Sequence, residues 1–196
     1  MFTGLVCYQG KFIGLRKSRT ELGLEVPEEL AARLESGQSL AVDGVCLTVS
    51  RKEKNQLFFT LSRESLDRTN LKDYRPGKNV NLELPLRLND FLGGHLVTGH
   101  IDGTGQVQEV KSRPPGKRLK IKVPTASRKY LVDKGSVAVN GVSLTVAALG
   151  PDWLEVELIP ATLQATNLNE LRPGDRVNLE GDIIGKYVYN FLSKKF

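Results

Sequence analysis

The second half of the chain repeats the first half. The run SLAVDGVCLTV at residues 39–49 returns as SVAVNGVSLTV at residues 136–146, and RPG and VNLE at 75–83 return at 172–180. The N-terminus takes part too, because FTGLV at residues 2–6 matches VTGHI at residues 97–101. A unit this long is a duplicated domain, since solenoid repeats run about 20–50 residues. Two related domains provide two related pockets, which can hold two similar ligands.

Each half reads as an antiparallel β-barrel. Short runs of alternating apolar residues are separated by Gly, Pro, Asn and Asp, a pattern typical of all-β barrels. In the first half we expect strands over residues 4–15, 21–26, 39–42, 45–52, 56–61 and 79–84. The boundaries predicted are an N-terminal barrel over 1–95, a C-terminal barrel over 96–182 and a tail over 183–196. Residues 87–94, which end in two glycines, form the linker.

Turn and helix signals fall at equivalent places in the two copies. Asp43-Gly44 and Asn140-Gly141 favour tight hairpin turns, because these residues accept a positive φ. Helices are expected behind prolines, over residues 27–36 and 124–133, where the missing N–H of proline suits the first helical position. A further helical turn should follow Ser65 and Thr162, ending near residues 71 and 168.

Composition narrows the function classes. A net charge of +6 and a pI near 9.3 are compatible with nucleic-acid binding. The basic residues are scattered, however, and no nucleic-acid recognition motif accompanies them, so a solvated surface is favoured. No apolar run approaches the ~20 residues of a membrane span. The start lacks a signal peptide, which predicts a cytoplasmic protein. Two cysteines and two histidines predict neither a disulfide framework nor a zinc site.

The tail has no counterpart in the first copy. Around residues 185–196, Ile184, Tyr187, Val188 and Phe191 recur at helical spacing, while Lys186, Asn190 and Lys194 fall elsewhere. This pattern predicts an amphipathic helix. Such a helix could pack back on a barrel, but after two complete domains we expect it to mediate self-association.

Both histidines of the chain lie in GGHLVTGHIDG at residues 93–103. Leu5 occupies the position that matches His100. Glycines beside His100 would let a planar ligand approach backbone N–H groups. The alternative is a β-bulge with a histidine at the barrel rim, and these residues alone leave both readings open.

Cys46 and Ser143 share one position of the repeat, and each precedes Leu-Thr-Val. Alternation along a strand puts Cys46 on one face with Thr48, and Ser143 with Thr145. Cysteine is often just a small buried hydrophobe, and no hydrolase motif surrounds the serine. Hydrogen bonding to a polar ligand is the function expected of Ser143, Thr145 and Thr48.

Two charged residues break the symmetry of the copies. Lys134 matches Gly37, and Asp182 matches Pro85. By default each would be a surface charge. Taken with His100 and Ser143, they predict that the second copy carries the more polar pocket.

These motifs, with MFTG at the N-terminus, resemble the riboflavin synthase family along essentially the whole chain. The resemblance implies two six-stranded Greek-key barrels and a homotrimer held by C-terminal helices. It also implies dismutation of two 6,7-dimethyl-8-ribityllumazine molecules by four-carbon transfer, without metal or organic cofactor. The resemblance also implies lumazine synthase as a further partner. The active site would lie between the N-barrel of one subunit and the C-barrel of its neighbour.

The resemblance also implies site residues. Catalytic roles would fall to His100, Ser143, Cys46, Lys134, Asp182 and Thr145, with His100 the first choice for proton transfer because an unperturbed imidazole titrates near neutrality. The ligand of the N-barrel would meet Ser39, Cys46, Leu47, Thr48, Thr60, Leu61, Ser62, Arg63, Glu64 and Ser65. That of the C-barrel would meet Gly4, Leu5, Val6, Ser143, Leu144, Thr145, Glu157, Leu158, Ile159, Pro160, Ala161 and Thr162. Gly99, His100, Ile101 and Lys134 would reach the N-barrel ligand of a neighbouring subunit.

Two features set the chain apart from the family pattern. Ala161 stands where the family usually has glutamate, which removes one carboxylate from the pocket, and Ser65 stands where threonine is usual. The rival function is that of a non-catalytic relative, such as lumazine protein, which binds one chromophore as an optical antenna. Those relatives lose the features kept here as His100, Ser143 and Thr145, which favours the enzyme.

Overall fold

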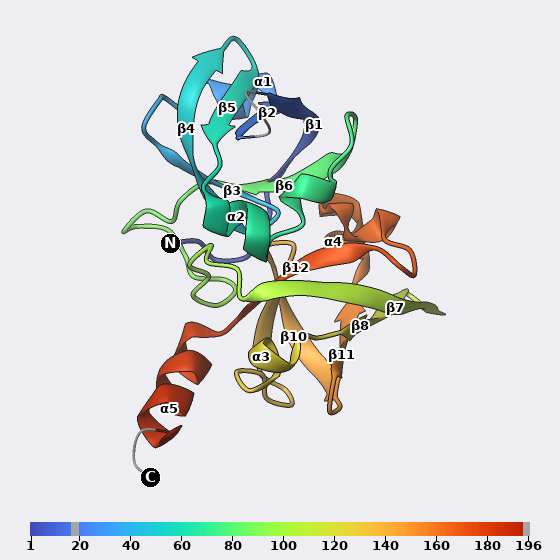
Figure 1. The fold of residues 1–196 in the computed structure, drawn as a ribbon. Helices are drawn as coiled ribbons and strands as arrows, with labels where there is room; N and C mark the ends of the chain where they lie inside the picture. The colour runs from blue at the N-terminus through green and yellow to red at the C-terminus, as the bar shows by residue number, and fades with distance from the viewer. Residues whose placement is uncertain (17–19, 194–196) are drawn as a thin grey trace.

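The computed structural model describes residues 1–16 and 20–193, and it contains two closed six-stranded barrels (Figure 1). The N-barrel has the strand order β1-β2-β5-β4-β3-β6, and the C-barrel β10-β11-β8-β7-β12-β9. Every pairing is antiparallel, and non-consecutive neighbours such as β2 with β5 give each barrel a Greek-key path. The expected all-β double barrel is therefore confirmed.

The N-barrel strands are β1 (Tyr8–Arg16), β2 (Glu21–Glu25), β3 (Ser39–Val42), β4 (Val45–Glu53), β5 (Gln56–Thr60) and β6 (Asn79–Glu83). Those of the C-barrel are β7 (Gly103–Arg113), β8 (Gly116–Lys122), β9 (Ser136–Val139), β10 (Val142–Leu149), β11 (Trp153–Leu158) and β12 (Arg176–Gly181).

The hairpin turns form as the sequence predicts. Asp43 and Gly44 have φ of 43° and 80°, and Asn140 and Gly141 have φ of 45° and 77°. Two consecutive residues with positive φ match the twist of the strands that they join. The turns therefore fix the register of β3 with β4 and of β9 with β10.

The helices are shorter than the sequence patterns indicate. Behind the prolines lie only α1 (Glu28–Ala31) and α3 (Thr125–Arg128). The later turns are α2 (Arg63–Arg68) and α4 (Pro160–Ala165), followed by the 3₁₀ turns η1 (Leu71–Asp73) and η2 (Asn167–Glu170). One helical turn is enough to close the open end of a barrel, and Leu30 on α1 is fully buried there.

A buried polar network joins the two barrels about a pseudo-twofold axis. The side-chain amide of Asn81 donates to the carbonyl of Asn140 across the interface, and that of Asn178 donates to the carbonyl of Asp43, both at 2.9 Å. The Asp43 carboxylate accepts the backbone N–H of Asn81 and the side-chain amide of Asn167. Burial raises the pKa of Asp43 above its usual value. Because these groups satisfy one another across the interface, the relative orientation of the barrels is specified.

The segment before each barrel crosses to the opposite barrel. Residues 3–6 (strap 1) and 98–101 (strap 2) run past each other, joined by the bridge between Phe2 and Val97. Val6 packs against the core of the C-barrel, and Ile101 packs against the core of the N-barrel. The prediction that residues 4–15 form one strand is thus wrong at its start. β1 begins at Tyr8, because strap 1 finds its partner on the other barrel.

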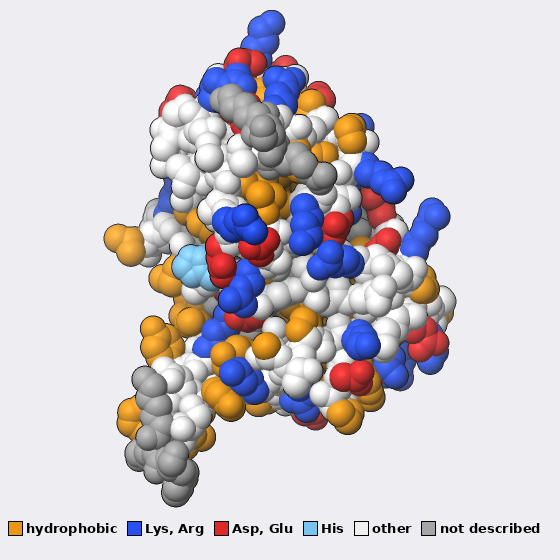
Figure 2. All heavy atoms as spheres, in the orientation of Figure 1, with side chains coloured by type: hydrophobic (Ala, Val, Ile, Leu, Met, Phe, Trp, Pro, Cys, Tyr) orange, Lys and Arg blue, Asp and Glu red, His pale blue; other side chains and the backbone are white. Residues whose placement is uncertain are grey.

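The tail forms α5 (Ile183–Ser193), which projects away from both barrels (Figure 1). Lys186 pairs with Asp102 at 2.7 Å, and the Tyr189 ring meets Tyr130 edge-on, so one side of α5 is tied to the C-barrel. The other side exposes Ile184, Tyr187, Val188, Phe191 and Leu192. Apolar side chains accordingly gather on this projection in Figure 2. The helix is confirmed, and Lys194 lies outside the described residues.

Candidate functional site

Two equivalent groups of predicted site residues lie at matching positions on the two barrels, and we name them the N mouth and the C mouth. The N mouth is formed by Cys46 and Thr48 of β4, strap 2 and residues 60–65. The C mouth is formed by Ser143 and Thr145 of β10, strap 1 and residues 157–162. Cys46 and Ser143 are half-buried and Thr48 and Thr145 are exposed, as alternation along a strand predicts. Each mouth thus presents a row of small polar side chains.

Four of the predicted contact residues point the other way. Leu47, Leu61, Leu144 and Leu158 are buried in the barrel cores, with exposures between 1% and 8%. A ligand at either mouth therefore meets these positions through backbone atoms and not through side chains. Their leucine identity serves packing.

Each strap is held beside its mouth by a backbone hydrogen bond from the neighbouring strand. The backbone N–H of Ser143 donates to the carbonyl of Gly4 at 2.8 Å, and that of Cys46 donates to the carbonyl of Gly99 at 2.9 Å. Gly4 and Gly99 have φ of +76° and +81°. A Cβ on Gly4 would lie 2.6 Å from that of Ser143, and one on Gly99 would lie 2.5 Å from that of Cys46. Only glycine permits this close approach.

The exchange of straps corrects two expectations about His100. Strap 2 lies on the N-barrel of its own chain, so no neighbouring subunit is needed to bring Gly99, His100 and Ile101 to the N mouth. His100 is exposed and belongs with Cys46 instead of Ser143. The polar residues predicted for one pocket are thus divided between two.

The histidine at the C mouth is His95, a residue that sequence reasoning did not single out. Its ring Nδ1 lies 2.7 Å from the hydroxyl oxygen of Ser143, and its backbone N–H donates to the carbonyl of Thr3 in strap 1. The side chain is 7% exposed. Burial lowers the pKa of His95, and the nearby charge of Asp182 opposes that shift.

A neutral imidazole against a hydroxyl is a proton-transfer pair. With the pKa of His95 lowered, the ring is uncharged near neutrality and can accept a proton from Ser143 or from a ligand beside it. The N mouth offers different chemistry, namely the Cys46 thiol and the exposed His100 imidazole. The two mouths therefore share a frame and differ in reactive groups.

The loops at the mouths are arranged by ordinary local interactions. Because Val49 pairs with Phe59, residues 60–65 leave the N-barrel sheet beside Thr48 and Cys46. Ser62 caps α2 by accepting the N–H of Ser65 at 3.0 Å, and the two hydroxyls lie 2.9 Å apart. Arg63 and Glu64 are both exposed, with i,i+4 partners on the same helix. Both Ser62 and Ser65 thus lie at the rim, ready to exchange these bonds for bonds to a ligand.

The equivalent loop at the C mouth is more apolar. The register of Val146 with Val156 brings residues 157–162 beside Thr145 and Ser143. Ile159, Pro160 and Ala161 are exposed, and Thr162 is half-buried. Glu157 pairs with Arg113 at 2.9 Å. Since the side chain of Ala161 ends at its methyl group, Glu157 is the carboxylate that this loop presents.

Lys134 and Asp182 have structural partners in this chain. Lys134 takes the left-handed conformation of its counterpart Gly37, with φ of 60°, and its ammonium lies 3.3 Å from the carbonyl of Ala147. The carboxylate of Asp182 accepts the N–H of Ile184 at 3.0 Å at the start of α5. Asp182 lies close enough to His95 to influence its pKa. The catalytic roles expected of Lys134 and Asp182 remain predictions.

A cavity of about 320 Å³ lies beside Cys46 of the N mouth. Its lining includes Ser39, Cys46, Gln38 and Arg33 from the barrel and Leu84 to Arg87 from the segment that follows β6. The predicted contact residue Ser39 thus lines the same cavity as Cys46, and in the sheet it pairs with Thr48. Within residues 1–16 and 20–193, no cluster of His, Cys, Asp and Glu side chains could hold a metal ion. No helix in that part of the chain is long and apolar enough to cross a membrane.

A family model and solved structures of other proteins show which class of protein has this architecture. The Lumazine binding domain family matches residues 3–85 and again residues 98–182. The structure of LumP complexed with riboflavin superposes with a TM-score of 0.85 at 26% identity, covering 92% of this chain and 99% of that one. The structure of LumP complexed with 6,7-dimethyl-8-(1'-D-ribityl) lumazine gives a TM-score of 0.84 at 24% identity, over the same shares of the two chains. The chain is therefore a protein built from two lumazine binding domains.

Relatives of similar sequence show which family within this class the chain belongs to. Riboflavin synthase of Mycobacterium tuberculosis is 41% identical over 200 residues, covering 98% of each chain. Riboflavin synthase of Bacillus subtilis is 37% identical over 195 residues, covering 99% of this chain and 91% of its own. The chain belongs to the riboflavin synthase family, whose members are transferases of riboflavin biosynthesis.

Proposed function

We propose that this protein converts two molecules of 6,7-dimethyl-8-ribityllumazine into riboflavin and 5-amino-6-(D-ribitylamino)uracil. The presence of two similar mouths with unlike reactive groups is the observation that carries this proposal. One lumazine must lose a proton from its C7 methyl group, and the other must accept the resulting carbanion. A duplicated frame binds the same substrate twice, and the differences in reactive groups give the two molecules different fates.

In the proposed mechanism the C mouth removes the proton. His95 is the base, acting directly or through the hydroxyl of Ser143, and the charge of Asp182 stabilises the imidazolium that forms. His100 and Cys46 serve the second substrate at the N mouth, where His100 can return a proton. Holding both rings stacked lowers the barrier further, because a bimolecular step becomes effectively unimolecular.

The two mouths of one chain lie on different barrels, so their ligands are joined by assembly. We place the N mouth of one subunit against the C mouth of its neighbour in a homotrimer. The exposed apolar side of α5 supports self-association, since apolar side chains gathered on one projecting helix are typical of an interface. Lys134 would complete the neighbour's N mouth. We also propose that the protein is cytoplasmic and that it catalyses the reaction without a metal or organic cofactor. Association with lumazine synthase is part of the same proposal.

The domain limits proposed are 1–95, 96–182 and 183–196. One refinement follows from the straps. Residues 3–6 precede the N-barrel in the sequence but pack against the C-barrel, and residues 98–101 precede the C-barrel but pack against the N-barrel. A chain cut at residue 95 would therefore separate strap 2 from the mouth that it lines.

One assay separates the enzyme from an antenna protein. Purified protein is incubated with 6,7-dimethyl-8-ribityllumazine alone, after treatment with a strong chelator and desalting, and riboflavin fluorescence is followed. We expect one riboflavin for every two lumazines consumed. Binding of lumazine without any turnover would support the antenna function, and a requirement for added metal or nicotinamide would refute the cofactor-free mechanism.

A further inference from the structure

Two buried glutamates occupy equivalent places at the ends of β6 and β12. Glu83 is 7% exposed and Glu180 is 1% exposed. Neither carboxylate takes part in the proposed proton transfer. Each is instead bound to a strap, in the same way to within a few tenths of an ångström.

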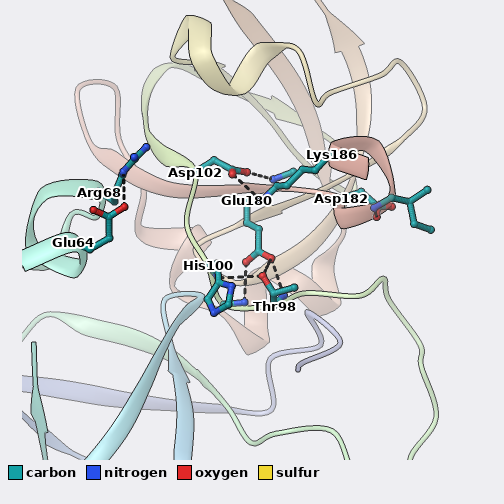
Figure 3. A network of polar contacts seen from close by, with 11 residues as sticks. Glu64, Arg68, Thr98, His100, Asp102, Glu180, Asp182 and Lys186 are labelled. Carbon is teal, nitrogen blue, oxygen red and sulfur yellow. Dashed lines mark hydrogen bonds and ion pairs between the residues drawn. The ribbon is translucent and has the colours of Figure 1, made fainter. Parts of the chain in front are cut away.

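Each carboxylate accepts three hydrogen bonds from its strap. One oxygen of Glu83 takes the backbone N–H and the hydroxyl of Thr3, both at 2.7 Å, and the other takes the N–H of Gly4 at 3.1 Å. Glu180 binds Thr98 in the same two ways at 2.7 Å and the N–H of Gly99 at 3.0 Å (Figure 3). Hydrogen bonds to an ionised acceptor are about twice as strong as neutral ones. Each strap is therefore fixed from one side by a carboxylate clamp.

The opposite side of each strap lies on the other barrel. Gly4, whose N–H is bound by Glu83 of the N-barrel, accepts the N–H of Ser143 of the C-barrel at its carbonyl oxygen. Gly99, bound by Glu180 of the C-barrel, accepts the N–H of Cys46 of the N-barrel. The clamp thus determines where the strap lies over a mouth that its own barrel does not contain.

We infer that Glu83 and Glu180 are crossed positioning residues, each built into one barrel and shaping the ligand site of the other. Glu83 sets strap 1, and with it Leu5 and the Thr3 carbonyl that binds His95, over the C mouth. Glu180 sets strap 2 and His100 over the N mouth. This inference rests on the proposed function for what the mouths bind.

Glutamine is the sharpest test of a clamp. Glu83→Gln and Glu180→Gln keep size and shape, but their amide nitrogen cannot accept a hydrogen bond, so at least one strap N–H loses its acceptor. A second pair, Thr3→Val and Thr98→Val, removes only the hydroxyl donor and leaves the carboxylate in place. If a glutamine variant fails to fold, the valine variant of the same strap decides the question.

The two histidines of the chain serve as separate reporters, because His95 lies at the C mouth and His100 at the N mouth. Protein with ¹³C-labelled histidine is examined by NMR without ligand, and riboflavin is then titrated by fluorescence. We expect Glu83→Gln and Thr3→Val to shift the ring resonances of His95 and leave those of His100. Glu180→Gln and Thr98→Val should do the reverse. Each glutamine variant should weaken riboflavin at one of the two sites by about tenfold.

The crossed pattern can fail in a clear way. A shift of His100 by Glu83→Gln, equal shifts of both histidines, or no shift of either would overturn the positioning roles. Wild-type protein that binds neither riboflavin nor the lumazine would instead overturn the proposed function. The histidine pattern of the ligand-free protein would still decide the clamps, so the two failures are distinguishable.

Discussion

Replacing Gly99 by alanine isolates the role of strap 2. The added Cβ would lie 2.5 Å from the Cys46 Cβ and 2.8 Å from the Cys46 backbone nitrogen. Carbon atoms in contact prefer about 3.5–4.0 Å, so the strap must move outward by roughly 1 Å. That shift breaks the 2.9 Å hydrogen bond between Cys46 and Gly99 and distorts the bonds to Glu180.

The stability cost has two parts. A non-glycine residue in the left-handed region costs roughly 1–2 kcal/mol, and losing one or two hydrogen bonds adds about 1–3 kcal/mol. Gly77→Ala is the matched control, because Gly77 has φ of +88° and no atom within 4 Å of its added Cβ. A loss of 1 kcal/mol lowers Tm by about 2–4 °C in a chain of this size. We therefore expect Tm to fall by roughly 2–8 °C for Gly77→Ala, and by at least twice that amount for Gly99→Ala.

Turnover should separate the two variants more strongly than stability does. Misplacement of a site element by about 1 Å can cost roughly 10²-fold in rate. We expect riboflavin formation by Gly99→Ala to fall by about that factor, while Gly77→Ala stays within about twofold of wild type. Steady-state kinetics with the lumazine, alongside thermal unfolding, measures both. Full turnover in folded Gly99→Ala would show that strap 2 has no part in the site.

Three further predictions concern the reaction and the assembly. His100→Leu, which copies Leu5, should spare lumazine binding but lower kcat by roughly 10²-fold or more if the imidazole transfers protons, and unchanged turnover would refute that role. Because burial lowers the pKa of His95, its ring stays neutral at pH values where free imidazole is charged. The acid limb of kcat/KM should therefore lie below about pH 6.5, and stability should fall as pH drops through that value, where the unfolded chain takes up the proton first. An acid limb above pH 7 would argue against His95 as the base. Ending the chain after Asp182 removes α5 and should give folded, ligand-binding monomers or dimers with much lower turnover, whereas light scattering that shows an active trimer would contradict the role of the helix.

Local patterns fixed much of the fold in advance. The prediction of residues 39–42 as a strand agrees with β3, and the strands predicted at 21–26, 45–52, 56–61 and 79–84 are correct to within one residue. Alternation of side chains has a period of two and depends only on neighbouring residues. The Asp43-Gly44 and Asn140-Gly141 turns depend on backbone conformations open to few residue types. Such features are readable without knowledge of the distant chain.

The duplication also showed where the two sites differ, but it grouped His100 with Ser143, whereas the resemblance to the riboflavin synthase family linked His100 to an N-barrel ligand. The comparison of Leu5 with His100, and of Cys46 with Ser143, was made along the chain, where His100 is on the same copy as Ser143. In the structure strap 2 crosses to the N-barrel and His95 takes the place beside Ser143.

The sequence by itself determined that there are two barrels, which residues alternate toward their cores and that a helix follows them. Only the tertiary structure decided which barrel each strap completes, and therefore which histidine lies at which mouth. The physical reason is that strand formation is governed by local periodicity, whereas strap exchange depends on contacts between distant segments. Glu83 with Thr3, Glu180 with Thr98 and Gly4 with Ser143 come together only when both barrels are folded and docked.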